Sequence, residues 1–136
     1  MKKPVLLILL LCLGCTAKTD TQIHISVVNQ SLQFTGLDAA IIGEISRDSS
    51  VSVWQSLLPV YRMPADTDMK DYQPVQPGKY GVRDSTVIFT PDTPFLKNQA
   101  YFVRWYQYSK GSSVWDHIKH HEKLGKQPYQ DLIFKL

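Results

Sequence analysis

Two histidines near the C-terminus have the spacing that a zinc site on a helix requires. His117 and His121 lie in the run DHIKHHE, and residues four apart face the same side of a helix, as two zinc ligands must. Ile118 stands where a metalloprotease helix carries its glutamate, and no third ligand is evident. We therefore interpret this run as a solvated polar helix face. A metal-dependent enzyme or metal-binding protein that uses the two histidines is the alternative.

Other signatures of catalysis are missing from the sequence. Asp66, Asp68 and Asp71 are spaced as in a calcium loop, but the glycine and the terminal glutamate of such a loop are not there. The sequence contains neither a G-x-S-x-G motif nor a glycine-rich phosphate loop. We therefore expect no catalytic residue, no cofactor and no enzymatic activity.

Aromatic residues are the other notable feature. Three tryptophans, Trp54, Trp105 and Trp115, accompany seven tyrosines. An exposed row of such side chains would suit the binding of a sugar or a protein. The alternative is that they fill the core of a small sandwich.

The segment from Ser85 to Tyr108 is the one around which the rest of the chain is organised. It contains two apolar runs rich in β-formers, 86–90 and 100–108, joined by a connection with two prolines. Apart from Arg104 and Gln107, the second run is apolar on both faces. This predicts a central strand of a sheet, covered on at least one side.

The remaining chain is predicted to form further short strands, one loop and one helix. The proline-containing piece 58–61 is expected to be an edge strand or a bulged strand. Residues 63–82 are expected to form a long surface loop with a type II turn at Pro77-Gly78. Ser113 and Gly125 bound a predicted helix. Apolar patterning predicts the other strands, over 23–27, 32–34, 39–45, 51–57 and 129–136. The fold class predicted is all-β, an antiparallel two-sheet sandwich with one short helix before the last strand.

The first 15 residues have the order of a secretory signal. Lys2 and Lys3 precede an aliphatic run that ends in Leu-Gly-Cys. A helix over 4–14 would extend roughly 17 Å, too short to span a bilayer of about 30 Å. The ending CLGC resembles the lipobox of bacterial lipoproteins, which implies cleavage before Cys15 and fatty acylation of that cysteine. The alternative is a plain secretory signal, with the cysteine incidental.

The lipoprotein resemblance also has consequences for location and organisation. It implies a bacterial envelope protein, and Thr16 after the cysteine favours the outer over the inner membrane. Residues 16–22 would be a tether, and 23–136 a single β-sandwich domain. Both cysteines precede residue 16, so a disulfide within this domain is excluded. Lys2 and Lys3 belong to the leader, so the mature chain is almost neutral and nucleic acid is not indicated as a partner.

A second resemblance concerns the connection within the central segment. Phe89-Thr90-Pro91, Pro94-Phe95 and Tyr101 resemble the strand, loop and strand near the end of bacterial Ig-like domains. The resemblance implies an Ig-like topology for the sandwich, with a crossover between the two sheets that is stiffened by proline. It also implies a buried tyrosine ring whose hydroxyl bonds loop backbone.

We expect a lipid-anchored envelope protein that acts as a non-catalytic binding or assembly module. Its partners would be membrane lipid, through Cys15, and another envelope protein or a glycan. A soluble periplasmic inhibitor or carrier that is never acylated is a further alternative.

Overall fold

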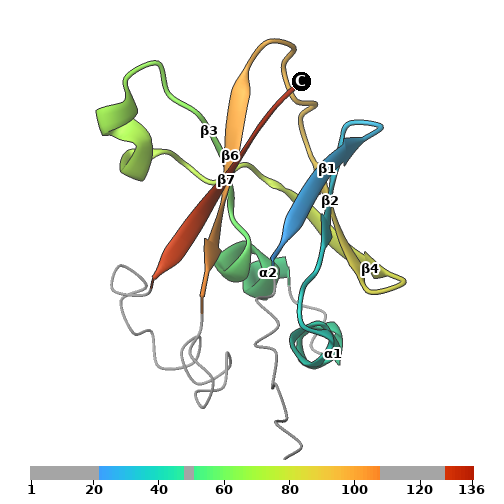
Figure 1. Ribbon diagram of the computed structural model, residues 1–136. Coiled ribbons are helices and arrows are strands. Elements are labelled where there is room, and N and C mark those ends of the chain that lie inside the picture. Colours follow the sequence, from blue (N-terminus) through green and yellow to red (C-terminus); the bar gives the residue numbers. More distant parts are fainter. Residues whose placement is uncertain (1–21, 48–50, 108–127) are drawn as a thin grey trace, which may run out of the picture.

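Two antiparallel sheets account for most of the regular structure in the computed structural model, which describes residues 22–47, 51–107 and 128–136 (Figure 1). The four-stranded sheet has the order β1-β2-β5-β4 and the three-stranded sheet the order β3-β6-β7. The strands are β1 (His24–Val28), β2 (Ser31–Thr35), β3 (Val60–Arg62), β4 (Gly78–Arg83), β5 (Thr86–Pro91), β6 (Ala100–Tyr106) and β7 (Tyr129–Lys135). The predicted antiparallel arrangement in two sheets is confirmed.

The hydrophobic core lies between the sheets. The four-stranded sheet contributes Phe34 and Phe89, both fully buried, and the three-stranded sheet contributes Val103. Phe95 links the two sides, because its ring packs 4.8 Å from that of Tyr101 and 6.4 Å from that of Phe89, centroid to centroid. Aromatic side chains therefore fill much of the interior. Trp54 is buried as well, whereas Trp115 lies outside the described residues.

Strand β6 is the central strand of its sheet, as the sequence predicts. It pairs with β3 on one side and with β7 on the other, and β3 lies at the edge, as expected for a strand that follows Pro59. The last strand is paired almost to the end of the chain, because Ala100 is the partner of Lys135 and Asn98 N–H donates to Leu136 O at 3.0 Å.

The connection between β5 and β6 crosses from one sheet to the other. Tyr101, at the start of β6, is only 3% exposed, and its hydroxyl oxygen accepts from the backbone N–H of Leu96 at 3.0 Å. The buried ring and the hydroxyl contact expected from residues 89–101 are thus both present. This tyrosine ties the proline-containing crossover to the core.

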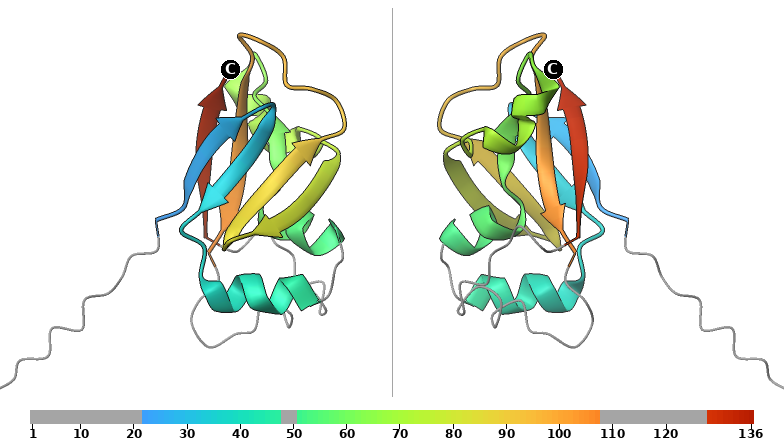
Figure 2. Two further views of the ribbon diagram at one scale, coloured as in Figure 1. Left: turned by 90° about the vertical axis from the view of Figure 1, so that its right-hand side faces the viewer. Right: turned by 90° about the vertical axis from the view of Figure 1, so that its left-hand side faces the viewer.

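Two segments predicted as strands, 39–45 and 51–57, are helices. α1 spans Ala39–Arg47 and α2 spans Val51–Leu57, and Figure 2 shows both at the end of the sandwich away from the crossover. Asp38 starts α1, since its carboxylate accepts from Ala40 N–H at 2.8 Å. In α2, buried Val53, Trp54 and Leu57 recur with helical spacing, and buried Leu58 follows directly. Burial at helical spacing outweighed the β-propensity of valine and tryptophan.

The segment 63–82 is less irregular than predicted. It contains a 3₁₀ helix, η1 (Thr67–Tyr72), and most of β4, an edge strand. The predicted type II turn at Pro77-Gly78 is wrong, because Gly36 is the glycine with a positive φ among those described. Gly78 has a different role: a Cβ there would collide with the Phe89 ring. The glycine lets β4 lie directly against a core aromatic side chain.

The helix predicted at 113–124 lies outside the described residues. No described helix is long and apolar enough to cross a membrane.

Replacing Tyr101 with phenylalanine tests the crossover contact. The ring remains, but Leu96 N–H loses its acceptor, so we expect Tyr101→Phe to lower the free energy of unfolding by about 1 kcal/mol. Urea titration measures it. Tyr72→Phe is the matched control, because Tyr72 is 77% exposed. Equal stabilities of the two variants would contradict the role assigned to the Tyr101 hydroxyl.

Candidate functional site

Arg104 is the one buried charged residue in the described part of the chain, and it lies on the outer face of the three-stranded sheet. Asp131 is its cross-strand partner on β7. The guanidinium meets this carboxylate with two hydrogen bonds, Nε to Oδ1 at 2.9 Å and Nη2 to Oδ2 at 3.0 Å. Nη2 also lies 2.8 Å from Oδ1 of Asp71 in η1. Two carboxylates from two elements thus neutralise one guanidinium.

Lys70 strengthens the same connection between η1 and the sheet. Its Nζ lies 2.7 Å from Oδ2 of Asp131 and 4.7 Å from the ring centroid of Phe102. On the other side, the Arg104 guanidinium packs 4.1 Å from the ring centroid of Tyr129. We call Lys70, Asp71, Arg104 and Asp131 the charge clamp. It fastens η1 across the outer face of the sheet, and Figure 2 (right) shows η1 in front of that sheet.

Contacts within the charge clamp shift the pKa values of Asp131 and Arg104. Burial raises the pKa of Asp131, but hydrogen bonds from Arg104 and Lys70 outweigh this and hold the pKa below its ordinary value. The hydrogen bond to Asp131 raises the pKa of Arg104, which burial opposes. Burial also raises the pKa values of Tyr61 and Tyr106, although Arg104 opposes both shifts. Arg104 and Asp131 therefore carry opposite charges at neutral pH, beside neutral Tyr61 and Tyr106.

The side chains of the charge clamp are suited to holding the structure together and not to acid–base catalysis. Its two positive and two negative side chains are all engaged with one another, and arginine does not give up its proton in proteins. A general acid or base instead needs a pKa near the operating pH. We therefore interpret the charge clamp as the fastening that holds η1 in place.

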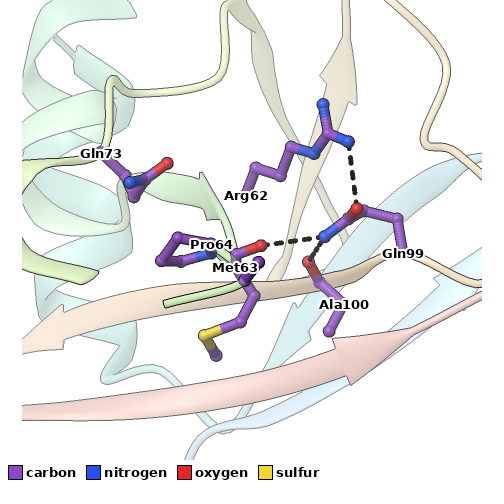
Figure 3. A pocket seen from close by; sticks show the side chains of 7 residues that line it. Arg62, Met63, Pro64, Gln73, Gln99 and Ala100 are labelled. Atoms are coloured by element: carbon purple, nitrogen blue, oxygen red, sulfur yellow. Dashed lines mark hydrogen bonds between the residues drawn. The ribbon is translucent and has the colours of Figure 1, made fainter. Parts of the chain in front are cut away.

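An open pocket lies where β3 ends, η1 ends and β6 begins (Figure 3). Its volume is about 440 Å³, within the range of small-ligand sites. Figure 3 shows Gln99 and Ala100 on one side and Gln73 on the other, with Met63 and Pro64 between them. The lining residues are Arg62, Met63, Pro64, Ala65, Gln73, Gln99 and Ala100. We call this the Arg62 pocket.

Hydrogen bonds hold the polar side chains of the Arg62 pocket in place. Gln99 Nε2 donates to the carbonyl oxygens of Met63 and Ala100, both at 2.9 Å. Its Oε1 accepts from Nη2 of Arg62 at 3.1 Å. On the other side, Gln73 Nε2 donates to Met69 O at 2.9 Å. The pocket thus presents one cation and two amides in fixed positions.

The site residues predicted from sequence are not brought together in the described structure. Cys15, His117 and His121 lie outside the described residues. Asp66 caps η1 by accepting from Asp68 N–H at 3.0 Å, and Asp71 belongs to the charge clamp, so these aspartates do not form a calcium loop. In the described ranges, no three His, Cys, Asp or Glu side chains are grouped so that they could hold a metal ion.

Sequence reasoning missed both the clamp and the pocket. Arg104 gave a signal, because it interrupts an otherwise apolar strand, and a buried cation requires a facing carboxylate. Asp131 alternates with apolar residues on the last strand, so an ion pair between Asp131 and Arg104 could have been predicted. Nothing in the sequence marks Arg62 or Gln99, since their contact depends on where the crossover ends.

A comparison with protein-family models found no match, and comparisons with curated proteins and with solved structures found none either.

A double substitution tests the charge clamp. We expect Arg104→Met to lower the free energy of unfolding by about 2 kcal/mol, because Asp131 loses its main partner while Lys70 still contacts it; removing one member of a fully buried pair costs roughly 3–5 kcal/mol. Adding Asp131→Leu should restore part of the loss, because the carboxylate left without Arg104 is then that of Asp71, whose side chain is 65% exposed and remains hydrated. Urea unfolding of both variants measures this. A double variant less stable than Arg104→Met would contradict the interpretation.

The lowered pKa of Asp131 predicts a specific acid sensitivity. Its pKa is lower in the folded than in the unfolded chain, so the stabilisation is complete above the unfolded value of about 3.9 and is lost as the pH falls through the folded value. We expect Asp131→Asn to be less stable than wild type at pH 7, with a difference that shrinks below about pH 4. Urea unfolding at a series of pH values measures it. Asp92→Asn, at an exposed position, is the control; a pH-independent difference for Asp131→Asn would contradict the prediction.

Proposed function

We propose that this protein is a lipid-anchored protein of the bacterial envelope that acts as a non-catalytic binding module, carried on an Ig-like β-sandwich. The observation that carries the binding role is the Arg62 pocket, where a cation and two amides are held rigidly around a volume of about 440 Å³. Rigid polar groups at the rim of an apolar depression are what a binding site needs, because little order is then lost when the ligand arrives.

The strand order supports an Ig-like topology. Constant-type Ig sandwiches pair strands A, B, E and D in one sheet and C, F and G in the other. Lettered along the chain, β1-β2-β5-β4 and β3-β6-β7 have the same orders. Tyr101 adds support, since it stands at the start of the sixth strand and accepts from upstream backbone, as the tyrosine of a tyrosine corner does. The helices between β2 and β3 are an addition to that pattern.

The N-terminal sequence supports the anchor. A basic start, an aliphatic run and the ending Leu-Gly-Cys place a thiol where a lipoprotein leader has its acylated cysteine. Strand β1 starts at His24, so few residues would separate a lipid on Cys15 from the sandwich. The Arg62 pocket would then work close to a membrane surface. Thr16 after the cysteine favours the outer membrane.

Mass spectrometry of the protein from its native cells tests the anchor. We expect a chain that starts at Cys15 and carries the mass of attached fatty acids, and that enters the detergent phase of a two-phase extraction. Cys15→Ser should abolish both properties, because the thiol is the attachment atom. A mature chain with an unmodified N-terminus in the aqueous phase would contradict the anchor. Turnover of an envelope substrate that one point substitution abolishes would contradict the non-catalytic role.

A further inference from the structure

We propose that the Arg62 pocket binds a carboxylate attached to a small apolar group, either a free organic acid or the C-terminal residue of a peptide. The inference deepens the proposed function by naming a class of ligand, and it rests on that function. It has three supports: the charge of Arg62, the contacts that orient its guanidinium, and the apolar surface beside it.

The charge of Arg62 is not neutralised by the described part of the chain. Its side chain is exposed, and no carboxylate of a described residue lies within 4.0 Å of it. Arg104 shows the contrast, because it is buried between two aspartates. A guanidinium has five N–H donors in a planar fork that matches a carboxylate. Only one contact of this fork is made within the described structure, to Gln99.

Gln99 orients this guanidinium for a ligand. Its amide nitrogen is fixed by the carbonyls of Met63 and Ala100, so its oxygen is held in one position, and that oxygen accepts from Arg62 Nη2 (Figure 3). Arg62 is thereby restrained at one edge of its fork. A side chain restrained before binding loses less rotamer entropy when a ligand arrives. Gln99 therefore acts as a positioning residue for Arg62.

The rest of the pocket fits a small apolar group near the carboxylate. Met63, Pro64, Ala65 and Ala100 supply apolar surface beside Arg62. Across the pocket, Gln73 uses its amide nitrogen on Met69 O, which leaves Oε1 as an acceptor for a ligand N–H. A peptide terminus has such an N–H next to its last residue, and a simple acid does not. The two possible sources of the carboxylate can therefore be distinguished.

The test compares three probes on the full mature chain in detergent micelles. N-acetyl-alanyl-alanine carries the carboxylate, its C-terminal carboxamide lacks only that charge, and propionate lacks the peptide N–H. NMR titration follows the side-chain amides of Gln73 and Gln99. We expect saturable shifts with N-acetyl-alanyl-alanine and a dissociation constant below about 1 mM. Affinity for the carboxamide should be at least roughly tenfold weaker, because it cannot form the charge-assisted pair.

Substitutions assign the effect to Arg62. Arg62→Gln should lower the affinity for N-acetyl-alanyl-alanine at least roughly tenfold, and Arg62→Lys should keep part of it, because the charge remains without the fork. Arg47→Gln, which removes an exposed arginine at the end of α1, should bind as wild type. An unchanged urea midpoint of Arg62→Gln shows that the fold is intact.

Two outcomes select the source of the carboxylate, and both support the site. Propionate that binds as well as the peptide indicates a free acid, and propionate that binds much more weakly indicates a peptide terminus. The inference is overturned if the carboxylate and carboxamide peptides bind equally, if Arg62→Gln binds as wild type, or if no probe gives a saturable shift. If one of these results is obtained with a chain that is acylated at Cys15, the inference about the ligand fails and the lipid anchor stands. If the native chain is not acylated but binds the peptide, the anchor fails and the inference about the ligand stands.

Discussion

A guanidinium can be buried in a sheet only if carboxylates neutralise it there, and Arg104 imposes this constraint on the structure. Asp131 satisfies it from the neighbouring strand and Asp71 from η1. Because Asp71 precedes the end of η1 by one residue, the ion pair holds this end of η1 against the sheet, next to Gln73, which lines the Arg62 pocket. One wall of the candidate binding site therefore depends on a charge buried on the outer face of the three-stranded sheet.

The opposite wall depends on the core. Tyr101 packs against Phe95 and Phe134 inside the sandwich, and its hydroxyl holds the crossover at Leu96. Gln99 lies between that contact and β6, so the crossover has little freedom where it forms the pocket. Backbone pairing of β3 with β6 adds the N–H of Met63, which donates to Ala100 O at 2.9 Å. Core packing and strand pairing thus fix Arg62 and Gln99 relative to each other.

Strands with strong patterns could be predicted from the sequence, and the central position of β6 followed from its two apolar faces. The helices α1 and α2 could not be separated from strands by composition, because β-branched residues occupy buried positions in both, Ile42 and Ile45 in α1 and Val53 in α2. Asp38 was the missed signal, since an aspartate just before Ala39 is a typical N-cap. The pocket was beyond sequence reasoning because Arg62 and Gln99 are 37 positions apart, and what brings them together is the register of β3 on β6.

Arg62 and Arg104 show how burial decides what the same side chain does. Arg104 is enclosed by Tyr129, Phe102 and two carboxylates, so its hydrogen bonds are used within the fold and its removal affects stability. Arg62 stands at a strand end in contact with solvent and with one amide, so the fold needs it little. A charge that the fold does not need, yet which the neighbouring amide orients, keeps its hydrogen-bonding capacity for something outside the chain. The candidate site is therefore placed at the arginine that contributes less to the stability of the protein.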